Sequence, residues 1–219
     1  MPQTAPASLP GPDEVAGTPA GGRVVGRVSR LTRYPLRSAR GEDLADVHCG
    51  PTGLEGDRAF VLLDADGRAL RGKEAPALAG LSASLPGGGL EVRDGDGRRL
   101  DADALPAVTC VAGARLAPAG EHGAAPGGDV VAPLHVVSEG AESGPGGEEC
   151  DPDPRANVVL ALAEGQGPGV ERGWVGAELA VGGVRLRVAR TPRRCLGVYA
   201  DVLVPGELAV GDEVHLLGS

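Results

Sequence analysis

The stretch that decides the fold is residues 178–214, which read ELAVGGVRLRVARTPRRCLGVYADVLVPGELAVGDEV. Runs rich in Val and Leu cover Glu178–Val181, Val184–Val188 and Val198–Val204, and the last part reads as a turn, a strand, a second turn and a final strand. Many short strands joined by frequent turns are typical of a barrel-like β fold.

Similar strand-like runs occur throughout the rest of the chain. They cover Arg23 to Leu31, Phe60–Leu63, Leu90–Arg93, residues 130–138 and Asn157–Leu162, and the segments Asp64–Gly67 and Asp94–Gly97 are turn signals. The 37 Gly and 19 Pro among 219 residues disfavour long helices. We therefore expect a mainly β protein (α+β) with few helices.

Charge and composition exclude several classes of partner. The net charge is −9 and the chain has only four aromatic residues, which argues against binding to nucleic acid or to an anionic membrane. No stretch of 18 apolar residues and no signal segment is present, and the four cysteines show neither close pairing nor zinc-ligand spacing. The sequence thus predicts a cytoplasmic protein with free thiols.

Cys195 is the first candidate for chemistry. It directly follows Arg193 and Arg194, whose positive field should stabilise the thiolate. A thiolate is the form that binds soft metals or attacks an electrophile. Thr191 and Pro192 precede the two arginines, which predicts that Cys195 lies on a loop after the strand at 184–188.

Three further arginines stand at predicted strand ends. Arg37 and Ser38 follow a strand, Arg58 begins one after a turn, and Arg155 enters another. Arginine suits phosphate because its planar guanidinium donates two parallel hydrogen bonds. Each site taken alone is equally an ordinary surface arginine, and Arg58 could simply pair with Asp57.

Taken in order, these segments resemble the MOSC family, named for the C-terminal domain of molybdenum cofactor sulfurase. The layout is similar to the two-part members that carry a MOSC N-terminal β-barrel-like domain, such as the mitochondrial amidoxime-reducing component and its bacterial relatives. The matching segments are Tyr34 to Ser38, Gly53 to Arg58, Phe60 to Gly67, Pro133 to Ser138, Arg155 to Val159, Trp174 to Gly176, Arg194-Cys195, Gly197 to Tyr199 and Val210 to Val214.

This resemblance implies a division of the chain. Residues 23–111 would form the MOSC N-terminal β-barrel-like domain, packed on a C-terminal MOSC β-barrel at 130–219, with a linker at 112–129. Residues 1–22 are rich in Pro, Ala and Gly, and we expect them to be a disordered lead-in.

The resemblance also implies the molybdenum cofactor (molybdopterin), with Cys195 as the molybdenum ligand and catalytic residue. The residues that would bind the cofactor are Arg37, Ser38, Arg58, Ser138, Arg155, Asn157 and Arg194. Reducing members of the family take an oxygen atom from a small N-hydroxylated substrate, while an electron-transfer protein supplies electrons. A molybdenum-dependent oxidoreductase is therefore the favoured prediction.

Two departures from the family pattern keep a second function open. Gly197 follows Cys195 after a single residue, where the family has a longer segment, and the loop after Ser138 lacks the apolar residues that usually begin a helix there. The alternative is a non-enzymatic carrier that hands the (sulfurated) cofactor to receiving enzymes.

Two other chemistries receive little support. Pyridoxal phosphate, which the parent sulfurase carries on another domain, would need Lys73, the single lysine, and no signature surrounds it. A Cys–His hydrolase would need Cys195 and His135, and no motif around Cys195 supports that pairing. A histidine within a strand, such as His135, is more often a packed side chain than a base.

Overall fold

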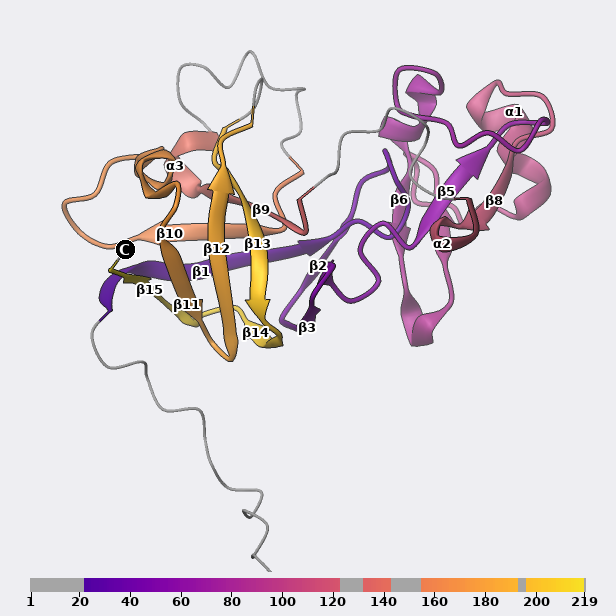
Figure 1. Ribbon diagram of the computed structural model, residues 1–219. Helices are drawn as coiled ribbons and strands as arrows, with labels where there is room; N and C mark the ends of the chain where they lie inside the picture. The colour runs from indigo at the N-terminus through magenta and orange to yellow at the C-terminus, as the bar shows by residue number, and fades with distance from the viewer. Residues whose placement is uncertain (1–21, 123–131, 143–154, 193–195, 219) are drawn as a thin grey trace, which may run out of the picture.

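The computed structural model describes residues 22–122, 132–142, 155–192 and 196–218. They form two bodies that lie side by side, a closed β-barrel and a smaller β-rich unit (Figure 1). The described part is mostly β with a few short helices, as the sequence predicts.

The barrel closes on itself through seven strands. Its neighbours around the ring are antiparallel, except for the parallel pair β9 and β10, and the pairing of β10 with β1 completes the circle. In ring order the strands are β10 (Val158–Leu162), β9 (Leu134–Ser138), β13 (Val198–Val204), β12 (Val184–Arg190), β11 (Glu178–Val181), β15 (Glu213–Leu217) and β1 (Arg23–Arg33).

Alternation along the strands explains the barrel interior. On β12, Val184, Leu186 and Val188 are buried, while Arg185 and Arg187 between them are exposed. Successive side chains of a strand point to opposite faces, so the apolar set fills the barrel and the arginines face solvent. Arg187 pairs across the hairpin with Glu178 at 3.0 Å.

β1 pairs with two barrel strands, β10 and β15, and it bends along its length. Its register shifts between Val24 and Gly26 and again between Val28 and Arg30, which marks two bulges. A Cβ at Gly26 would lie 2.4 Å from the carbonyl oxygen of Ala161, so only glycine allows the backbone of β10 to come this close.

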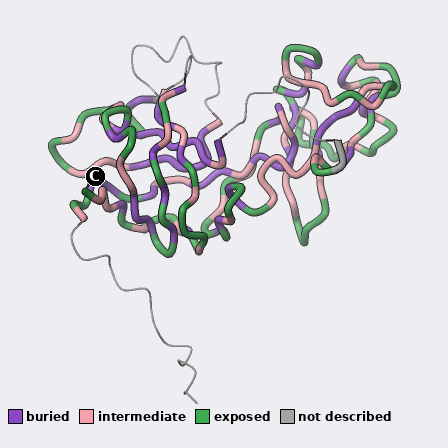
Figure 2. The backbone as a smooth tube through the Cα atoms, viewed as in Figure 1, coloured by how far each residue is buried: buried purple, intermediate pink, exposed green. Residues whose placement is uncertain are grey.

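The smaller unit packs around its own apolar core, in which Leu36, Leu62, Leu78 and Leu105 are almost fully buried. Figure 2 shows buried stretches of chain in both bodies. Its elements are β5 (Phe60–Leu63), η1 (Pro76–Gly80), β6 (Ser82–Ser84), η2 (Pro86–Gly88), β7 (Glu91–Arg93), η3 (Ala102–Ala104), α1 (Leu105–Thr109), β8 (Arg115–Pro118) and α2 (Ala119–His122). β5 pairs with β8 and β6 with β7.

The remaining elements connect these bodies or cover the barrel. They are β2 (Glu42–Leu44), β3 (Asp46–Gly50), β4 (Gly53–Leu54), α3 (Glu139–Glu142), η5 (Val170–Trp174) and β14 (Gly206–Ala209). β2 pairs with the end of β1, and β3 pairs with both β4 and β14. No helix in the described ranges is long and apolar enough to cross a membrane.

The packing differs from the sequence prediction in three places. β1 belongs to the range predicted for the first domain, but it is a barrel strand paired with β10 and β15. β8 lies in the predicted linker at 112–129, where its alternating Leu116 and Ala117 pair with β5. A short helix, α3, does follow Ser138, and its buried Ala141 packs in a cluster with Val137 and Val159. The lead-in, apart from Gly22, lies outside the described residues.

Candidate anion and cofactor site

Strand pairing brings the predicted site segments to one place. Leu31 of β1 is opposite Val158 of β10, so the segment after β1 meets the segment before β10. The chain from Tyr34 to Arg37 then follows the start of β5, where Arg58 donates its N–H to the Tyr34 carbonyl (2.8 Å) and Arg37 donates to the Phe60 carbonyl (3.0 Å). The junction of barrel and smaller unit is therefore where these arginines gather.

Arg155 contacts Ser38 directly. Its guanidinium donates to the Ser38 carbonyl oxygen, with Nη2 2.6 Å from that oxygen. This bond connects the approach to β10 with the segment after β1, and both residues are among those predicted to bind the cofactor.

Ser38 and Arg58 have strained backbones. Their φ angles are +72° and +54°, and Cys110, after α1, is the one other non-glycine residue with positive φ in the described ranges. Such left-handed conformations cost on the order of 1–3 kcal/mol each and cluster at functional sites. Here they turn the chain at two of the predicted binding residues.

Arg58 also forms the ion pair that the sequence left open. Its Nε lies 3.3 Å from Oδ2 of Asp57, whose side chain is only 4% exposed, and its Nη1 donates to the Ala132 carbonyl at 3.4 Å. Asp57 in turn accepts the Tyr34 N–H at 2.8 Å. Burial raises the pKa of Asp57, and the charge of Arg58 opposes that rise. A guanidinium has five N–H donors, so these contacts leave Arg58 with donors for a ligand.

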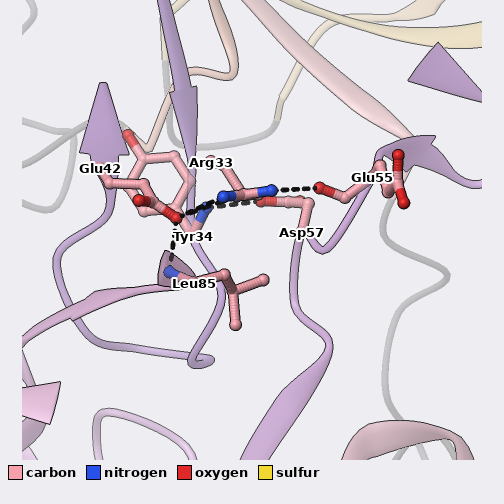
Figure 3. A network of polar contacts seen from close by, with 6 residues as sticks. All are labelled: Arg33, Tyr34, Glu42, Glu55, Asp57 and Leu85. Atoms are coloured by element: carbon pink, nitrogen blue, oxygen red, sulfur yellow. Dashed lines mark hydrogen bonds and ion pairs between the residues drawn. The ribbon is translucent and has the colours of Figure 1, made fainter. Parts of the chain in front are cut away.

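A polar network behind Asp57 fixes this junction (Figure 3). Arg33 donates to the carboxylate of Glu42 (2.7 Å) and to the carbonyl of Glu55 (3.1 Å). The Glu42 carboxylate also accepts the backbone N–H of Leu85 at 2.9 Å. The end of β1 is thus tied to the turn that delivers Arg58 and to the smaller unit.

Arg37 lies in a cationic environment. Burial lowers its pKa, the charges of Arg71 and Arg58 lower it further, and Glu74 acts in the opposite sense. The sequence alone does not single out Arg71, because no motif surrounds it or its neighbour Lys73. The turn at Asp64–Gly67 is the sequence feature that could have indicated the position of Arg71. This turn returns the chain alongside β5, where the Leu70 N–H donates to the Leu62 carbonyl.

Ser138 and Asn157, also predicted to bind the cofactor, are fully buried and bonded within the fold. The Ser138 hydroxyl accepts the Gly169 N–H at 2.9 Å. The Asn157 amide accepts the His135 N–H (3.2 Å) and donates to the Thr32 carbonyl (3.3 Å). In the structure both side chains stabilise the strands that carry the site.

His135 is a packed side chain, 4% exposed. Its Nε2 lies 2.8 Å from the Leu196 carbonyl oxygen, and its ring centroid lies 5.1 Å from that of Tyr199. Burial lowers the pKa of His135, against the effect of its hydrogen bonds to the backbone of Leu196 and Arg155, which raise it. Arg194 and Cys195 lie outside the described residues.

The donor set fits a phosphate-bearing group. Arg37, Arg58 and Arg155 converge near Ser38 in a chain of net charge −9, and guanidinium groups bind phosphate with two parallel hydrogen bonds. Within the described ranges, no group of three or more His, Cys, Asp or Glu side chains could hold a metal ion. A metal ligated by a single thiolate and its own cofactor does not need such a group.

Comparison with known proteins identifies the family. Residues 25–132 match the family model described as MOSC N-terminal beta barrel domain, a range that contains Arg37, Ser38 and Arg58. This part of the chain is therefore a MOSC N-terminal beta barrel domain, which supports the predicted resemblance to the MOSC family.

Other comparisons are more distant. No curated protein matches the chain. Among solved structures it is similar to the YuaD protein from Bacillus subtilis, at 13% identity and a TM-score of 0.42, over 88% of this chain and 95% of that one.

Proposed function

We propose that this protein binds the molybdenum cofactor and uses it to reduce small N-hydroxylated compounds. The observation that carries the proposal is the convergence of Arg37, Arg58 and Arg155 near Ser38, from three separate segments of an acidic chain. A MOSC N-terminal domain over residues 25–132 supports a function related to this cofactor.

Each of these residues has a defined task in the proposal. Arg37, Arg58 and Arg155 bind the phosphate and polar edge of the pterin, and the left-handed backbone at Ser38 turns the chain toward them. Asp57 orients Arg58, while Ser138 and Asn157 hold the strands beneath. Cys195 ligates molybdenum as a thiolate, with Arg194 beside it. The bound cofactor would supply a two-electron redox centre for removal of oxygen from the substrate, with the electrons coming from an external electron-transfer protein.

Metal and pterin analysis tests the binding. Wild-type protein from a cofactor-producing host should contain molybdenum and pterin, and Arg37→Gln and Cys195→Ala should contain much less. Arg37 is a cleaner target than Arg58, because buried Asp57 depends on Arg58. The matched controls are Arg68→Gln, on an exposed turn, and Cys110→Ala, an exposed thiol. Wild-type protein without molybdenum, or equal contents in all variants, would refute the assignment.

A carrier of the cofactor is the second candidate, favoured by one observation. β13 begins at Val198, only three residues after Cys195, which leaves little chain to enclose a substrate. Reduction of a simple N-hydroxylated compound by the loaded protein with an electron donor separates the functions. Turnover that Cys195→Ser abolishes supports the reductase; no turnover, with transfer of the cofactor to a receiving enzyme, supports the carrier.

A further inference from the structure

The segment from Arg71 to Glu74 lies beside Ser38, although it belongs to none of the matched motifs. A Cβ built on Gly72 would lie 3.6 Å from both Cβ and Oγ of Ser38. The contact arises because Leu70 bonds to Leu62 of β5, while Leu36 pairs with Phe60 of the same strand. Two separate segments thus follow β5 and meet at Ser38.

The backbone of Arg71 is held in a tight turn. Its N–H donates to the Glu74 carboxylate (2.8 Å), and its carbonyl accepts the N–H groups of Glu74 and Ala75 (2.9 Å each). Glu74 is therefore engaged with the backbone, and no ion pair in the described ranges joins the Arg71 guanidinium to a carboxylate. The side chain is half-buried, so part of its hydration is already lost.

Like charges at this place carry an electrostatic cost. Arg71 and Arg58 are near enough to Arg37 for their charges to depress its pKa. Asp57 balances Arg58, but Arg37 and Arg71 have no carboxylate within ion-pair distance in the described ranges. Two such guanidinium groups beside a strained turn are stabilised by a doubly charged anion, because each contributes attraction in a partly dehydrated setting.

We propose that Arg71 is a further phosphate ligand of this site and binds the same phosphate group as Arg37. The phosphate can belong to the pterin cofactor or be free inorganic phosphate. The inference rests on the proposed function only if the phosphate belongs to the pterin cofactor.

Phosphate titration of the cofactor-free full-length protein tests the inference. The melting temperature and calorimetric affinity are measured against inorganic phosphate at constant ionic strength, with chloride as the reference anion. Loss of one charge-assisted hydrogen bond predicts about tenfold weaker binding for Arg71→Gln. Arg68→Gln, on the preceding exposed turn, should bind as the wild type does. Equal phosphate affinity in Arg71→Gln and wild type, or phosphate binding no tighter than chloride binding, overturns the inference.

A second measurement separates the two sources of phosphate. Molybdenum and pterin contents are determined for wild-type and Arg71→Gln protein from a cofactor-producing host. If Arg71→Gln binds phosphate weakly and the wild type holds no molybdenum, Arg71 belongs to a site for free phosphate and the proposed function fails. If the wild type holds molybdenum while Arg71→Gln keeps wild-type phosphate affinity, the function stands and the Arg71 inference fails.

Discussion

Replacement of Asn157 by alanine distinguishes a structural amide from a cofactor ligand. The side chain is fully buried and satisfies the N–H of His135 and the carbonyl of Thr32. Alanine removes both bonds, and the loss of a bond to a buried backbone group costs about 1–3 kcal/mol. Both bonds are long, at 3.2 and 3.3 Å, so the lower end of that range applies. We expect Asn157→Ala to lose roughly 2–3 kcal/mol of unfolding free energy.

Urea denaturation of the cofactor-free protein measures this loss, and the melting temperature should fall by roughly 5–10 °C for a chain of this length. Gln166→Ala is the matched control. Its amide donates to the Val25 carbonyl (3.0 Å), but its Oε1 is buried without a partner, so the variant removes one bond and one unsatisfied atom. The control should change stability by less than about 1 kcal/mol. A loss this small for Asn157→Ala would refute the structural role and leave ligand binding as the reason for this residue.

Two further predictions concern titrating groups. Because burial raises the pKa of Asp57 above its ordinary 3.8, the stability that Asp57 contributes is present in acid and is lost as pH rises through the folded-state pKa. Asp57→Asn keeps an acceptor for the Tyr34 N–H. Urea unfolding from pH 4 to 7 should therefore show a flatter dependence of stability on pH than in the wild type, and no loss of stability at pH 7. A large loss at pH 7 would mean that the ion pair with Arg58 dominates. Burial raises the pKa of the Cys49 thiol to about 11, whereas Cys110 is exposed. Alkylation at pH 8, followed by peptide mass analysis, should label Cys110 rapidly and Cys49 only after unfolding, and equal rates would contradict this burial.

Local pattern predicts many of the strands because it depends on neighbouring residues. The alternation of Val and Arg in β12 and the turn at Asp64–Gly67 are both confirmed. Closure of the barrel is different, because β1 pairs with β10 and β15 from far along the chain. No local pattern in β1 encodes its partners. The strand β8 is likewise not predicted, because its neighbours in the sequence are rich in glycine.

The candidate site shows the same division. The family motifs identified Arg37, Ser38, Arg58 and Arg155, and the structure places these four residues together. Arg71 could not be identified this way, because its position depends on a hairpin that returns along β5 to Ser38. The strained φ angles of Ser38 and Arg58 are likewise a tertiary property, since the packing around a residue must hold it in such a conformation.

The four arginines of the site come from both bodies of the fold, and this links anion binding to folding stability. Arg155 belongs to the approach to a barrel strand, whereas Arg58 and Arg71 border β5 of the smaller unit. An anion bound by residues of both bodies binds the folded junction and not the unfolded chain, so its binding free energy adds to folding stability. Without the anion the arginines repel one another, and together they attract the anion. The junction is therefore the part of the fold whose stability should respond most to anion binding. Hydrogen exchange of the Ser38 and Arg58 amides should therefore slow on phosphate binding more than exchange within β12, and uniform slowing would place the anion elsewhere.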